Sequence, residues 1–173
     1  MFPMKFDHKV LETLPVPDTE RIQEVLQILR TITMGRVIPY FRKKKGTDPS
    51  VIARVVEHLF IKRLEDAENH IHTVSLLSRE DKTWIIHIHE RIFDYLAFVI
   101  PSDPESRLGG HTGEEKKVLA FTEFLLRHEI EHMLYPKRSE REVIRSDVKH
   151  AEKILNKCLK RWLITVEGAV HPG

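Results

Sequence analysis

The chain has 173 residues, of which 41% are hydrophobic and 31% are charged, and its formal net charge is +2 with histidine neutral. This composition excludes a disordered chain, and so small a net charge gives no electrostatic reason to expect a nucleic-acid or membrane partner. The length suits one globular domain with its own core. The single cysteine, Cys158, excludes an intramolecular disulfide, and no apolar run reaches about 18 residues, so we expect a cytoplasmic protein.

Helix patterns dominate the sequence. Apolar residues recur at spacings of three and four over segments that predict helices at 18–34, 48–77, 78–100, 112–135 and 139–162. Capping residues support several of these starts: Asp48 before Pro49, Thr112 with Glu115, and Ser139 with Glu142. We therefore predict a mainly α fold in which about five helices form one bundle-like domain.

The remaining segments are assigned by exclusion. The single domain is expected to span residues 1–173, with an extended N-terminal arm at 1–17 and a C-terminal tail at 166–173. The short apolar runs 97–100 and 163–166 are the candidates for a minor β element, and no strand is expected before Thr112. The irregular stretch 102–113 is a candidate lid or substrate contact.

The predicted helix 112–135 contains the segment HEIEH at 128–132, an instance of H-E-x-x-H. Residues four apart lie one above the other on a helix, so the imidazoles of His128 and His132 can hold one metal ion. Glu129 lies beside them, where it can take a proton from water activated by that ion. The three side chains continue the apolar stripe of the helix, and ionisable groups in such a place need partners. The sequence therefore predicts a divalent metal site at His128 and His132.

A catalytic zinc site commonly has three protein ligands and one open position, so a third ligand is expected. Acidic side chains of the predicted helix 139–162 are suitably placed. Asp147 is the first choice; Glu140 is the second, because its place in the first helical turn also suits the helix dipole. Glu142 points to the opposite face, as its capping role requires, and His150 is a candidate to support Asp147.

These residues resemble the zincin metallopeptidases, particularly the gluzincin-like minimal proteases that include the ImmA/IrrE family. The likeness rests on the motif at 128–132 and on the acidic amphipathic helix that follows a proline, and it covers about 25 residues. It implies that His128 and His132 bind zinc, that Glu129 is the general base, and that an acidic residue of the next helix completes the site, with a peptide or protein as substrate. The sequence differs at Glu131, where zincins have an uncharged residue, and in lacking a predicted strand beside the motif helix.

A metal centre inside a helical bundle, of the ferritin-like or hemerythrin-like kind, is an alternative. Glu129 and His132 then form an E-x-x-H pair, Glu129 becomes a ligand, and iron replaces zinc. Polar side chains on the apolar stripes of the second and third predicted helices support this interpretation: Asp66, His70, His89 and Glu90.

A non-enzymatic helical interaction module is the third hypothesis. The basic run 42–45 beside Tyr40 and Phe41 would then contact nucleic acid or acidic partners, although a solvated loop is the commoner role of such a run. Cys158 shares a stripe with Leu155 and Trp162, and this placement favours packing over nucleophilic chemistry.

Overall fold

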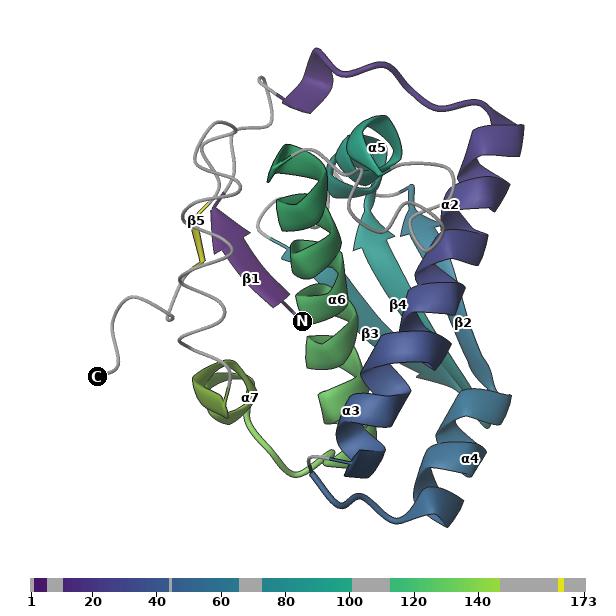
Figure 1. The fold of residues 1–173 in the computed structure, drawn as a ribbon, viewed down its shortest axis with the longest axis vertical. Coiled ribbons are helices and arrows are strands. Elements are labelled where there is room, and N and C mark those ends of the chain that lie inside the picture. The colour runs from purple at the N-terminus through teal and green to yellow at the C-terminus, as the bar shows by residue number, and fades with distance from the viewer. Residues whose placement is uncertain are drawn as a thin grey trace.

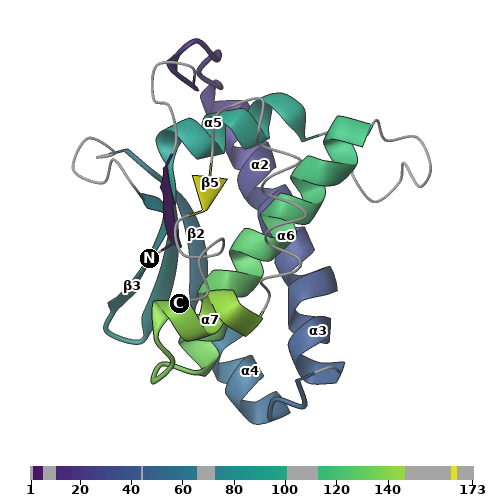
Figure 2. The ribbon, with the colours of Figure 1, turned by 90° about the vertical axis from the view of Figure 1, so that its left-hand side faces the viewer.

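The computed structural model describes residues 2–5, 11–43, 45–65, 73–100, 113–146 and 165–166. These residues form a mixed β-sheet whose one face is covered by helices, as the two views in Figure 1 and Figure 2 show. The fold is thus a mixture of helix and sheet, and the predicted helical bundle is wrong.

The sheet has the strand order β2-β4-β3-β1-β5. Its strands are β1 (Phe2–Lys5), β2 (Leu59–Leu64), β3 (Thr73–Glu80), β4 (Thr83–His89) and β5 (Thr165–Val166). β2 runs parallel to β4, whereas β3 is antiparallel to both β4 and β1, and β1 is antiparallel to β5. β3 and β4 form a tight hairpin in which Asp81 takes the left-handed conformation, with φ of 59°.

The helices are α2 (Thr19–Ile32), α3 (Ile38–Lys43), α4 (Pro49–Glu57), α5 (Glu90–Val99), α6 (Gly113–Leu134) and α7 (Glu140–Ser146), and a π-helical turn, Thr33–Val37, joins α2 to α3. Side-chain caps fix the starts of α2 and α4, because Asp18 accepts a hydrogen bond from the Arg21 amide and Asp48 accepts one from the Ser50 amide. Among the described residues, no helix is both long and apolar enough to cross a membrane.

Two predicted helices are replaced by strands. The segment 48–77 is helical only to Glu57 and then enters β2, and the segment 78–100 forms the end of β3, all of β4 and then α5. Residues four apart share one face in a strand as well as in a helix, so the stripe that predicted helices also fits these strands. The run 97–100 is not a strand, since residues 97–99 end α5, whereas Thr165–Val166 of the second run do form β5.

The other boundaries follow the predictions more closely. The helices predicted at 18–34 and 112–135 are present as α2 and α6, and the arm 1–17 contains β1. Of the helix predicted at 139–162, the first part is α7, and the rest lies outside the described residues, as does the candidate lid at 102–113 except for Gly113.

The core lies between the helices and the sheet. α6 contributes Phe121, Leu125 and Ile130, none of which is exposed, and these pack in one cluster with residues of α2, α5 and β4. Burial on this scale fixes how α6 lies against the sheet. The C-terminal half of α6, which carries the histidine motif, is held in place by this packing.

Candidate metal centre

The motif helix brings His128, Glu129 and His132 to the sheet side of α6. The side chains of His128 and Glu129 are almost completely buried, with exposed fractions of 1% and 0%, and that of His132 is 14% exposed. The two imidazole rings meet edge to face, with 4.9 Å between their centres. The arrangement that the i, i+4 spacing predicts is therefore present.

A short turn returns the chain onto these histidines. The Tyr135 amide donates to the Glu131 carbonyl at 2.8 Å as α6 ends, and Pro136 follows. Ser139 and Glu142 then form the predicted capping box, each backbone amide donating to the other side chain, at 3.1 and 3.2 Å. This box starts α7 and places Glu140 in its first turn.

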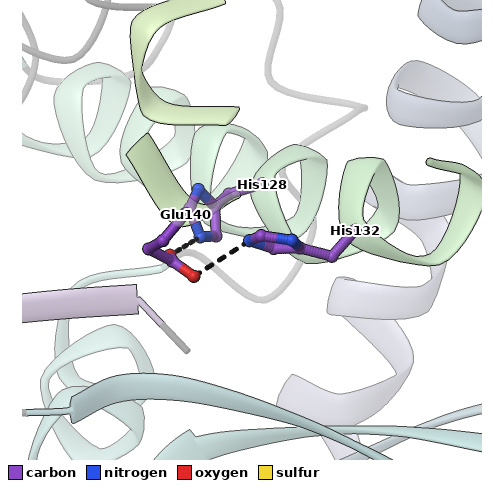
Figure 3. A group of neighbouring side chains, drawn as sticks. All are labelled: His128, His132 and Glu140. Atoms are coloured by element: carbon purple, nitrogen blue, oxygen red, sulfur yellow. Dashed lines mark hydrogen bonds and ion pairs between the residues drawn. The ribbon is translucent and has the colours of Figure 1, made fainter. Parts of the chain in front are cut away.

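Glu140 faces both histidines (Figure 3). Its Oε1 lies 2.5 Å from Nε2 of His128, and its Oε2 lies 3.0 Å from Nε2 of His132. One donor atom from each of the three side chains lies within 4.8 Å of the other two, so this group could hold a metal ion. Two imidazoles and one carboxylate form a donor set that suits zinc and other divalent transition metals.

The carboxylate of Glu140 stays ionised in this environment. Burial would raise the pKa of Glu140, but hydrogen bonds from His128 and His132 more than offset that effect and hold the pKa well below its usual range. An ionised carboxylate is the form that binds a cation.

Glu129 lies next to the three-residue group without belonging to it. Its Oε1 accepts a hydrogen bond of 2.7 Å from the hydroxyl of Ser75 on β3 and lies 4.0 Å from Nε2 of His128. Its Oε2 is buried and has no hydrogen-bond partner among the described residues. A buried carboxylate oxygen in this state is costly unless a ligand meets it. The geometry fits a metal site that includes a water or substrate group beside Glu129.

Glu131, the charged residue that departs from the zincin pattern, has a structural role. Its side chain is 2% exposed and pairs with Arg138 across the turn between α6 and α7, at 2.6 Å. The guanidinium of Arg138 lies 4.0 Å from the centre of the Tyr135 ring, and the Tyr135 hydroxyl is 2.8 Å from that of Thr47. These contacts stabilise the turn that places Glu140 beside the two histidines.

The predicted third ligands have different outcomes. Glu140, the second choice, is brought to the histidines, whereas Asp147 and its candidate partner His150 lie outside the described residues. The assignment of Glu142 to a capping role is correct.

Of the residues proposed for a bundle centre, the two in the described part of the chain, His89 and Glu90, do not join this site. Asp66 and His70 lie outside the described residues. His89 ends β4 and caps α5 by accepting a hydrogen bond from the Arg91 amide at its Nδ1, and Glu90 lies 3.8 Å from Arg63. Neither His89 nor Glu90 belongs to the group with His128.

In the described part of the basic run and its aromatic neighbours, residues 40–43 are helical. Residues 42 and 43 end α3, and Phe41 is completely buried. Tyr40 packs against Phe41 and is covered by the guanidinium of Arg127, 4.0 Å from the ring centre. Cys158 lies outside the described residues.

Ser75 is the site residue that sequence reasoning missed. It lies 54 residues before Glu129, on a strand that was expected to be helical. Its neighbours Thr73 and Val74 are β-branched, as strands favour, and they are the one local signal for its setting, because Leu76 and Leu77 suit a helix equally well.

Comparison with known proteins assigns no family. No protein-family model matches the chain, and searches of the curated proteins and of the solved structures found no match either. The functional conclusion therefore rests on the geometry of the site.

Proposed function

We propose that the protein is a zinc-dependent hydrolase of the zincin type that acts on peptide bonds. The observation that supports this proposal is the joint placement of three metal-binding groups, His128, His132 and Glu140, with a fourth ionisable group, Glu129, outside that set but adjacent to it. A catalytic zinc site has this composition: three protein ligands, an open position and a nearby base.

The protein groups have separate tasks in this proposal. A divalent ion held by the three side chains would supply Lewis-acid activation of water and of a substrate carbonyl. Glu129 accepts the proton of the attacking water on Oε2, the oxygen that has no described partner, and passes it to the leaving amine. Ser75 holds the other oxygen and thereby fixes the orientation of the carboxylate.

The edge of the sheet near the motif helix is consistent with an extended peptide as substrate. β3 lies beside α6 and supplies Ser75, so the strand that the sequence did not predict is present next to the motif helix. β1 pairs with β3 only at Thr73 and Ser75 among the described residues, which leaves residues 76–80 without a partner strand on that side. An extended peptide can add to such an edge through backbone hydrogen bonds.

The bundle alternative loses its structural framework. A ferritin-like or hemerythrin-like centre requires facing helices, but His89 ends β4 and Glu90 pairs with Arg63, while Asp66 and His70 lie outside the described residues. The interaction-module hypothesis and the cytoplasmic location stay predictions.

Metal analysis together with a proteolysis assay tests the proposal. Purified protein should contain about one zinc per chain. Glu129→Gln should keep the metal and lose about 10²- to 10⁴-fold of its activity on an unstructured protein such as casein, because a general base contributes that much. If this variant loses the metal, Glu129 is a ligand and the proposed mechanism is wrong; if the metal-loaded wild type cleaves neither casein nor a peptide library, the peptidase assignment is wrong.

A further inference from the structure

A cavity lies at the C-terminal end of α6. Some of its lining residues follow the metal-site residues directly in the sequence, but it is lined by different side chains. Its volume is about 560 Å³, and α4, the β3–β4 hairpin and the end of α6 surround it. These three elements meet at the lower end of the molecule in Figure 1. Met133 and Leu134 form part of its wall directly after His132, but none of the three metal-binding residues lines it.

The lining of this cavity combines an apolar base with positive charge. The apolar part comprises Val51, Val55, Trp84, Met133, Leu134 and Pro136. Arg54 and His58 enter from α4, and Arg79 and Lys82 enter from the hairpin, whereas no acidic residue lines the cavity. Two elements that are distant in the chain thus direct cationic groups into one space.

Three of the four basic residues, Arg54, Arg79 and Lys82, form no ion pair with a residue in the described part of the chain. The fourth, His58, has its Nε2 3.9 Å from Oε2 of Glu57, and Arg54 interacts electrostatically with Asp48. Arg79 lies over the ring of Trp84, 4.8 Å from its centre, and donates to the Asp81 carbonyl at 3.2 Å. An anion that entered the cavity would find donors already oriented by their neighbours.

Acidic residues outside the cavity limit the size of that anion. Glu57 precedes His58, with a side chain that is 73% exposed, and Glu80 and Asp81 stand exposed between Arg79 and Lys82 in the sequence. A long polyanion such as a nucleic acid would extend across these carboxylates, and its phosphates would be repelled by them. A short peptide segment that has a few carboxylates between apolar side chains can meet the cations and the apolar base without extending over these acidic residues.

We propose that this cavity binds an acidic segment of a peptide or protein, in which glutamate or aspartate side chains meet the four basic residues and adjacent apolar side chains pack on Trp84, Val55 and Met133. The site does not need the metal ion, because it contains none of the metal-binding residues. It is therefore independent of the hydrolytic activity proposed above.

Calorimetric titration of the full chain tests this proposal. The probe is a short peptide, blocked at both ends, that alternates leucine and glutamate, and its counterpart has glutamine in place of glutamate. We expect saturable binding of the glutamate peptide with and without EDTA, much weaker binding of the glutamine peptide, and a dissociation constant that rises with salt. The double variant Arg54→Gln with Lys82→Gln should weaken binding by about tenfold, since two ion pairs are lost.

Lys62→Gln is the matched control, because Lys62 is an exposed cation on β2 that does not line the cavity. Equal weakening by this control, equal binding of the two peptides, or no binding at all would each overturn the proposal. Inorganic phosphate and a single-stranded oligonucleotide serve as competitors of the bound glutamate peptide. If either one displaces the peptide at a lower concentration than unlabelled glutamate peptide does, the cavity is a site for phosphate ligands and the proposal is wrong.

Discussion

The hydrogen bond from Ser75 to Glu129 offers a direct test of how the sheet supports the site. Ser75→Ala removes the donor to Oε1, and Oε2 of Glu129 has no hydrogen-bond partner among the described residues. The carboxylate is 0% exposed, so bulk solvent does not replace the donor that Oε1 loses. A buried group left without its partner costs about 1–3 kcal/mol.

This cost can be measured as a shift of the melting temperature. For a chain of this size each kcal/mol changes Tm by roughly 2–4 °C, so a cost of about 1–3 kcal/mol should lower the Tm of Ser75→Ala by about 2–12 °C. Ser75 is not one of the metal-binding residues, so the zinc content should not change, whereas hydrolytic activity should fall because Glu129 loses its fixed orientation.

Ser78→Ala is the matched control for this experiment. Ser78 lies on the same strand, and its hydroxyl is 2.9 Å from Nε2 of His87. Because Ser78 is partly exposed, water can replace this contact. We therefore expect Ser78→Ala to lose less than about 1 kcal/mol of stability, with a correspondingly small fall in Tm. Equal melting temperatures for wild type and Ser75→Ala, with a lower one for Ser78→Ala, would refute the assignment of Ser75 as the residue that holds Glu129.

Two further predictions concern the metal and the fold. Glu140→Gln should raise the dissociation constant for zinc at least tenfold in a chelator competition assay, because a charged ligand becomes a neutral one; unchanged affinity would exclude Glu140 as a ligand. Arg63→Met should lower the free energy of unfolding in urea by about 3–5 kcal/mol, because Asp94 is 3% exposed and is held by two hydrogen bonds from Arg63, at 2.9 and 3.0 Å. The double variant with Asp94→Leu should recover part of that loss, and a double variant as unstable as Arg63→Met would contradict the buried-charge explanation.

Local signals in the sequence predicted the helices α2 and α6 and two of the caps, but not the sheet. Asp48 and the box of Ser139 with Glu142 act within one turn of the chain, and both cap as predicted. β4 is different because it lies between β2 and β3, and Ile85, Ile86, Ile88 and His89 are all buried. A strand that is buried on both faces lacks the alternation that identifies strands at a sheet surface.

The residues of the candidate site were likewise predictable from the sequence only where local spacing defines them. His128 and His132 were found because their spacing on one helix is a property of the sequence alone. The choice between Asp147 and Glu140 depends on where the turn after α6 directs the chain, and this direction is set by Arg138, Tyr135 and Thr47 through contacts that no periodicity reports. Ser75 was missed because it reaches Glu129 only through the pairing of strands.

The three metal-binding residues are close neighbours in the chain, since His128 and Glu140 are 12 positions apart. Closing so short a loop costs little entropy, so a metal ion can recruit these ligands before the rest of the chain has folded. The ion would then bind the unfolded chain as well and stabilise the native state by less than its affinity implies. The proton transfer proposed for Glu129 has a different requirement, because the hydrogen bond from Ser75 forms only when the sheet does. A preparation can therefore carry a full load of metal and still be inactive, and metal content by itself does not measure the amount of folded protein.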